Sequence, residues 1–190
     1  MNREDLLAEL ASHAPSDAHE AELLAWMRRF VAGPADPFAR ENPEGHITAS
    51  AIVARPDGSE FLLLYHRKLG RWLQPGGHTE YSDTSAFDAA LREAGEETGI
   101  AELHAPLGRT ILDVDVHTIP ARGKDPAHHH FDVRFLLTTS ADVDRDAAED
   151  SERPMKWRRL EEARKAGADA SLMRALEKAR KALVPAGSPA

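Results

Sequence analysis

The stretch GGHTEYSDTSAFDAALREAGEETGI, residues 76–100, decides the fold because it joins a glycine pair to an acidic helix. Residues three and four apart face each other on a helix, so Glu93 opposes both Glu96 and Glu97, and each like-charge pair costs roughly 0.2–0.5 kcal/mol. The glycine between them adds about 1 kcal/mol relative to alanine. Because Gly99 is a typical C-terminal cap, the later carboxylates also lie near the negative end of the helix dipole. A bound divalent cation would offset this crowding.

The same stretch resembles the signature of the Nudix hydrolases, the MutT-like pyrophosphohydrolases, which cleave a nucleoside diphosphate linked to a further group. Its second half matches the family pattern at every fixed position: Arg92, Glu93, Ala94, Glu96, Glu97, Gly99 and Ile100. The first half departs from the pattern, because Asp83 stands in the place of a glutamate and eight residues instead of seven separate it from Arg92. The resemblance implies an α/β fold of the Nudix type, an α/β/α sandwich with a mixed sheet.

The residue chemistry and the resemblance predict one catalytic site. Magnesium prefers hard oxygen ligands and is usually shared between protein carboxylates and substrate phosphates. We expect Glu93, Glu96 and Glu97 to hold one or more Mg²⁺ ions, or Mn²⁺ in their place, with the main-chain carbonyl of Gly77 as a further ligand. The metals would neutralise the diphosphate and activate a water that attacks phosphorus in the P–O–P bridge. The resemblance implies that Arg92 orients the glutamates by ion pairing. A solvated helix face with a surface ion pair is the alternative.

The run HHHFDVRF, residues 128–135, has the alternation of a strand. Its polar side chains, His128, His130, Asp132 and Arg134, are expected on one face and mostly apolar ones on the other. One interpretation is a half-buried strand with a wet polar face. In the other, this face lines the substrate cleft, where His130 or Asp132 positions phosphate or water. A zinc site built from the adjacent histidines is disfavoured, because thiolates are absent and the acidic helix favours magnesium.

Two charged segments outside the signature supply further candidates. In this family a general base often lies on a loop outside the signature, and the candidates here are Glu149, Asp150 and Glu152. Just before the signature, residues 66–72 group several cations that could meet phosphate charge, and Arg67 is the predicted substrate contact. Both segments could equally be solvated surface.

Composition restricts the class of protein. The chain has 190 residues, enough for one sizeable core, with 42% hydrophobic and 29% charged residues, as in ordinary globular proteins. The net charge of −8 disfavours passive binding to nucleic acid or to anionic membranes. The absence of cysteine excludes thiol chemistry, including that of the isopentenyl diphosphate isomerases, which share the Nudix fold. No apolar run approaches the ~20 residues of a membrane span, so we expect a cytoplasmic protein.

The chain divides into three predicted parts. Residues 1–40 form an N-terminal helical arm and connector, with amphipathic helices at 4–11 and 17–32. Residues 41–185 form the Nudix hydrolase domain, and 186–190 a flexible tail. The arm could pack on the domain, cover the cleft or help form a homodimer.

Within the domain, the pattern predicts a mixed sheet with helices on both faces. HITASAIVAR and EFLLLYHR form a hairpin across the turn PDGS, and RWLQPGGH ends a short strand in a glycine loop. The acidic helix begins after Asp83 or Thr84 and ends near Thr98. TILDVDVHTI, HHHFDVRFLLTT and MKWRR are further strands, and residues 160–183 are helical with a break near Gly167.

The leading hypothesis is therefore a Mg²⁺-dependent pyrophosphohydrolase that acts on a small-molecule nucleoside diphosphate derivative, such as a nucleoside triphosphate or a sugar nucleotide. The alternative is a Nudix-like domain that binds a nucleotide without catalysis. Domains of that kind tend to lose the carboxylates of the signature, whereas all three are present here. Their presence favours catalysis.

Overall fold

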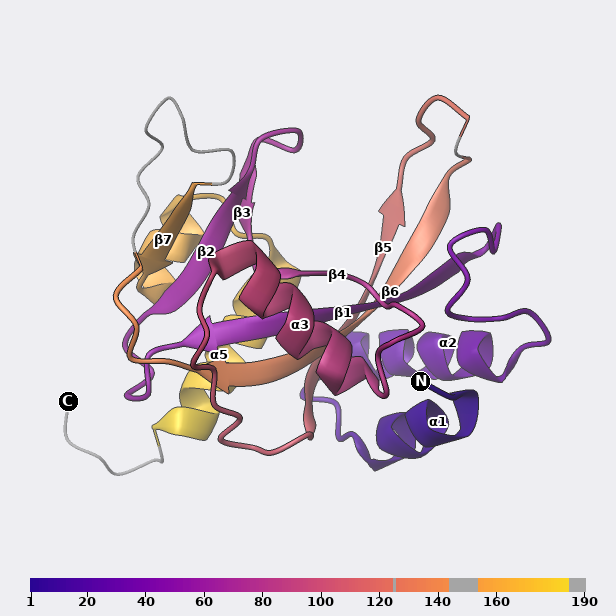
Figure 1. Ribbon diagram of the computed structural model, residues 1–190, viewed down its shortest axis with the longest axis horizontal. Helices are drawn as coiled ribbons and strands as arrows, with labels where there is room; N and C mark the ends of the chain where they lie inside the picture. Colours follow the sequence, from indigo (N-terminus) through magenta and orange to yellow (C-terminus); the bar gives the residue numbers. More distant parts are fainter. Residues whose placement is uncertain (125, 144–153, 185–190) are drawn as a thin grey trace.

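A mixed sheet of seven strands forms the centre of the molecule (Figure 1). The structure is a computed structural model that describes residues 1–124, 126–143 and 154–184. Its strands are β1 (Gly45–Ala54), β2 (Phe61–His66), β3 (Arg71–Leu73), β4 (Gly76–His78), β5 (Ile111–Ile119), β6 (His128–Thr138) and β7 (Met155–Arg158). The order is β3-β2-β1-β6-β5, with β4 paired to β1 and β7 paired to β2. Only the pairing of β1 with β6 is parallel among the described strands.

Helices cover both faces of the sheet, as the sequence predicts (Figure 1). They are α1 (Arg3–Ser12), α2 (Ala18–Ala32), α3 (Ala86–Thr98), α4 (Leu160–Lys165) and α5 (Ala170–Leu183). Alternate residues of β1 join different hydrophobic clusters: Ala51 packs with α1, α2 and α3, and Ile52 packs with α4 and α5. The result is the three-layer α/β/α sandwich expected from the sequence. In the described parts of the chain, no helix is long and apolar enough to cross a membrane.

The N-terminal arm packs into the main core. Leu10 on α1 and Met27 on α2 are fully buried in the same cluster as Phe131 on β6. The ring of Phe30 stacks on that of Phe131, with 3.9 Å between their centroids. Of the three roles considered for the arm, packing on the domain is therefore present. The division of the chain at residue 40 stays a prediction.

Two local predictions need correction. Helix α3 is capped by Ser85, whose hydroxyl accepts a hydrogen bond from the Asp88 N–H, and not by Asp83 or Thr84, because the Asp83 carboxylate is bonded to Arg92 instead. The glycine pair is not a loop but strand β4, in register with β1. The hairpin, the three later strands and the helix break are confirmed.

One face of β6 carries three successive kinds of side chain. His128 and His130 come first, then Asp132 and Arg134, and finally Leu136, which joins the core under α4 and α5. The predicted alternation is confirmed, because the residues between them on the other face, Phe131, Val133 and Phe135, join the first core. The first of the two interpretations, a wet polar face, does not hold for Asp132 and Arg134, which are only 2% and 3% exposed.

Candidate active site

Two glycines of β4 bring the strand against the acidic helix α3. A Cβ atom added at Gly77 would lie 2.6 Å from a carboxylate oxygen of Glu93, so a larger residue there would displace that carboxylate from its present position. The N–H of Gly76 donates a hydrogen bond to the Glu97 carboxylate at 3.0 Å. Gly99 ends the helix in the left-handed conformation, with a φ of 73°. The glycine pair therefore allows two of the predicted ligands to approach the strand.

Arg92 holds the acidic groups in place. Its guanidinium makes a two-point pair with Asp83, at 2.9 and 3.0 Å, and also donates to Glu93 at 3.0 Å and to Glu96 at 3.2 Å. Burial by itself would raise the pKa of Asp83, but the hydrogen bonds from Arg92 keep that pKa below its usual value. The ion pairing expected of Arg92 is present, and Asp83 provides its anchor despite the altered spacing.

The three glutamates are not equally placed. Glu93 and Glu97 face β4, whereas the side chain of Glu96 is 60% exposed and bonded to Arg92. Within the described ranges, these glutamates do not form a group of three ligands close enough to hold one metal ion in their present conformation. The donor set nevertheless suits a hard cation, because the Glu93 and Glu97 carboxylates lie against the backbone of the glycine strand, and oxygen is the ligand that Mg²⁺ prefers. The residues therefore fit Mg²⁺.

The predicted substrate contacts lie in different surroundings. Arg67 lies in the exposed turn that follows β2, and His130 lies in a group of histidines. Asp132 is buried, and its carboxylate accepts hydrogen bonds from Thr48 at 3.0 Å, Ser50 at 2.8 Å and Arg134 at 2.9 Å. These bonds give Asp132 a full set of protein partners. The three candidates for the general base, Glu149, Asp150 and Glu152, lie outside the described residues.

Asp132 belongs to a buried group of charges that we call the ionic zone: Asp132 and Arg134 on β6 with Asp113 and Asp115 on β5. The Arg134 guanidinium contacts all three carboxylates, at 3.2 Å for Asp113 and Asp115 and at 2.9 Å for Asp132. Burial alone would raise the pKa of Asp115, but its bond to His117 and the charge of Arg134 bring that pKa well below its usual value.

Helices α5 and α2 extend this zone. Arg174 on α5 pairs with Asp113 at 2.9 Å, and Lys178 bridges Asp113 at 3.1 Å and Glu20 at 2.6 Å. Glu20 is fully buried on α2 and is also bonded to His13 at 2.8 Å. Burial would raise the pKa of Glu20, yet the hydrogen bonds from His13, Lys178 and Ser16 lower it far below its usual value. The ionic zone thus ties the arm and the last helix to the sheet.

Sequence reasoning missed a cavity of about 600 Å³ at the segment that follows the glycine strand. It lies between the connector, which contributes Phe38 and Arg40, and the segment after β4, which contributes Thr79 and Tyr81. The signal in the sequence is an aromatic residue and an arginine in a connector that is otherwise rich in proline and glycine.

A carboxylate helix packed against a glycine strand in a mixed α/β sandwich defines a domain of the Nudix type. The family model described as "NUDIX domain" matches residues 44–177, so the chain belongs to this family. Members of the family are generally pyrophosphohydrolases of nucleoside diphosphate-linked substrates and typically depend on a divalent metal. No curated protein sequence matches the chain.

Solved structures support the fold. The chain is similar to the dihydroneopterin triphosphate pyrophosphohydrolase of E. coli, with a TM-score of 0.54 and 19% identity over 70% of this chain and 92% of that one. It is also similar to a MutT NUDIX hydrolase from Burkholderia pseudomallei, with a TM-score of 0.50 and 23% identity over 70% of this chain and 95% of that one. At these identities, the similarity shows the fold alone.

Proposed function

We propose that the protein is a Mg²⁺-dependent hydrolase that cleaves the pyrophosphate linkage of a nucleoside diphosphate joined to another group, with Mn²⁺ as a substitute metal. The observation that carries this proposal is the packing of Glu93 against Gly77, next to the hydrogen bond between Glu97 and Gly76. Nothing about general surface charge requires two glycines opposite two carboxylates. A metal ion that is bound by both the protein and the substrate phosphates, in contrast, requires protein oxygen ligands that lie close to the backbone of this strand.

Each residue of the site has a distinct part in this proposal. Glu93, Glu96, Glu97 and the carbonyl of Gly77 would hold the metal, which supplies charge neutralisation to the diphosphate and lowers the pKa of a bound water. Arg92 is a positioning residue: it fixes Glu93 and Glu96 through ion pairs and is itself fixed by Asp83. The rest of the site therefore depends on a guanidinium that does not touch the reacting atoms.

We further propose that the cavity at the segment after β4 receives the part of the substrate beyond the reacting phosphates. Phe38 and Arg40 line this cavity together with residues 79–82, so they offer it an aromatic surface and a cation. Aromatic rings and arginine are the side chains that stack on bases and bind phosphate. Arg67, in its exposed turn, is a second proposed phosphate contact.

The test is hydrolysis of a panel of nucleoside triphosphates, sugar nucleotides, ADP-ribose and dinucleoside polyphosphates, with Mg²⁺, Mn²⁺ or a chelator. We expect turnover of at least one compound only with metal, and a rate at least about 10-fold lower in Glu96→Gln. Glu102→Gln, at an exposed position beyond the helix, is the matched control and should keep full activity. Full activity in Glu96→Gln would contradict the mechanism. Binding without turnover across the panel would favour the non-catalytic alternative.

A further inference from the structure

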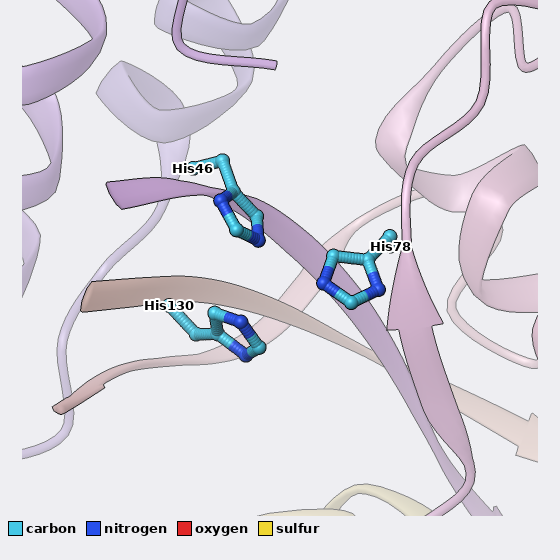
Figure 2. Close-up of side chains that lie close together, drawn as sticks. All are labelled: His46, His78 and His130. Carbon is cyan, nitrogen blue, oxygen red and sulfur yellow. The ribbon is translucent and has the colours of Figure 1, made fainter. Parts of the chain in front are cut away.

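Three histidines far apart in the sequence meet on one face of the sheet. His46 lies on β1, His78 on β4 and His130 on β6, and Figure 2 shows their rings turned toward a common space. One ring nitrogen from each forms a set whose members all lie within 4.8 Å of one another. The register explains the meeting, because His46 is directly paired with His130 and the partner of His78 is Thr48, two residues further along β1. We call these residues the histidine trio.

The imidazole of His46 is buried, and its hydrogen-bonding capacity is not satisfied by the described protein. It is 3% exposed, and neither of its ring nitrogens has a hydrogen-bond partner in the described parts of the chain. Its neighbours are other imidazoles, with ring centroids 4.7 Å away for His130 and 4.9 Å for His78. A buried donor or acceptor left unpaired costs about 1–3 kcal/mol, so such a group calls for an explanation.

The gathering of the rings favours a cation over an anion as the missing partner. The ring centroids of the trio lie 4.7–5.1 Å apart, and protonated imidazoles so close together in a buried place would repel one another. Neutral imidazole is the form that binds metals, whereas phosphate is bound by protonated histidine.

We propose that the histidine trio binds a divalent first-row transition metal ion, with Zn²⁺ as the reference case. Imidazole nitrogens suit such ions and do not suit Mg²⁺, which prefers oxygen. In a tetrahedral zinc site with Zn–N bonds of 2.0–2.1 Å, the nitrogens lie about 3.3 Å apart. Rotation of the three side chains about their χ angles would close the present separation of up to 4.8 Å. Three histidines leave a fourth position open, as in zinc sites that bind water or a substrate group.

The neighbours of the trio are arranged to support such a site. The Nδ1 atom of His128 is hydrogen-bonded to the Pro126 carbonyl at 2.9 Å, and that of His117 to the Asp115 carboxylate at 3.2 Å. Both rings lie against His130, with centroids 5.4 Å away. Metal-binding histidines usually donate one ring N–H to a carboxylate or a carbonyl, which fixes the orientation of the ring and leaves the other ring nitrogen free for the metal. Either ring could occupy the fourth position.

The proposed site is separate from the magnesium site but shares a strand with it. Consecutive residues of a strand point to opposite faces, so Gly77 faces Glu93 on α3 while the His78 side chain faces His46. Arg92 donates a hydrogen bond to the His78 carbonyl at 3.0 Å, which links the two sites through the backbone of β4. Histidine variants and glutamate variants should therefore remove different metals.

The experiment measures Zn²⁺ binding to untagged protein stripped with a chelator. Calorimetric titration and the metal content after dialysis should both give one Zn²⁺ per chain in wild type, in Glu96→Gln and in the control His19→Ala, which changes an exposed histidine on α2. His78→Ala and His130→Ala should bind at least about tenfold more weakly. Co²⁺ gives an independent readout, because a tetrahedral site with nitrogen ligands absorbs visible light much more strongly than an octahedral site with oxygen ligands.

Circular dichroism and thermal melting would establish that each variant is folded. His78 is only partly buried, so His78→Ala keeps the test decisive if His46 or His130 variants do not fold. Three results would overturn the proposal. These are no Zn²⁺ on the wild type, Zn²⁺ binding that is lost in Glu96→Gln and unchanged in the histidine variants, or binding of inorganic phosphate in place of Zn²⁺.

Discussion

The ionic zone and the histidine trio occupy the same face of the sheet, only two residues apart on β6. They differ in whether their buried polar side chains have partners within the protein. In the ionic zone, Arg134 contacts Asp113, Asp115 and Asp132, and two cations of α5 complete the balance. In the trio, His46 is equally buried but has no hydrogen-bond partner among the described residues.

The comparison shows how to distinguish buried polar side chains that stabilise the fold from those that bind a ligand. A buried charge that is paired and hydrogen-bonded by the protein needs no further partner and serves folding. A buried polar group that the protein leaves unpaired calls for a partner from outside the chain, either an ordered water or a ligand. By this criterion Asp132 belongs to the fold, whereas the unpaired His46, which lies against His130, marks the proposed binding site. The sequence alone grouped Asp132 with His130.

The largest effect is expected from breaking the ionic zone. Arg134→Met would leave three buried carboxylates without their central cation, and we expect the free energy of unfolding to fall by about 3–5 kcal/mol. Urea unfolding followed by circular dichroism measures this change. The control is Arg71→Met, whose pair with Asp169 is about half exposed and should be worth less than about 1 kcal/mol. Equal losses in both variants would remove the distinction between the ionic zone and an ordinary surface pair.

A smaller effect is expected in the pH dependence of the stability that Glu20 contributes. The folded-state pKa of Glu20 lies below its reference value of 4.5, so the unfolded chain binds more protons in acid and the stabilisation present above pH 4.5 is lost as the pH falls. We expect Glu20→Gln to be less stable than wild type at pH 7, with the difference shrinking by more than about 1 kcal/mol between pH 6 and pH 3. Urea unfolding across this range is the measurement. A constant difference would mean that the Glu20 carboxylate does not titrate with folding.

The smallest effect, and the one of opposite sign, is expected in the trio. His46→Leu removes two unpaired ring nitrogens from a buried position, so the metal-free protein should become more stable, by about 1 kcal/mol. The same variant should no longer be stabilised by Zn²⁺, in contrast to wild type, whose unfolding would become dependent on Zn²⁺ concentration. Thermal melting with and without Zn²⁺ measures both changes. Destabilisation of the metal-free protein by more than about 1 kcal/mol would indicate that His46 already has a partner.

Local patterns were sufficient for much of the fold. Alternation along residues 128–135 predicted which side chains share a face of β6, and apolar spacing predicted both helices of the arm. They failed where the outcome depends on a distant segment. The cap of α3 is Ser85 because Arg92 engages Asp83, and the glycine pair is a strand because β1 lies beside it. Of the two interpretations of the polar face of β6, the exposed one fails for Asp132 and Arg134, because α5 covers this face through Arg174 and Ser171.

By itself, the sequence determined that a carboxylate-bearing helix follows a glycine pair, that strands and helices succeed one another in the order of a mixed α/β sandwich, and that the chain resembles the Nudix family. These features are encoded by residues near one another in the chain, where spacing translates directly into geometry. Only the tertiary structure decided that Asp132 is satisfied by an arginine and that His46, His78 and His130 converge. Strand order and register bring together residues separated by dozens of positions, and the spacing of neighbouring residues in the sequence does not predict which of them will be in contact.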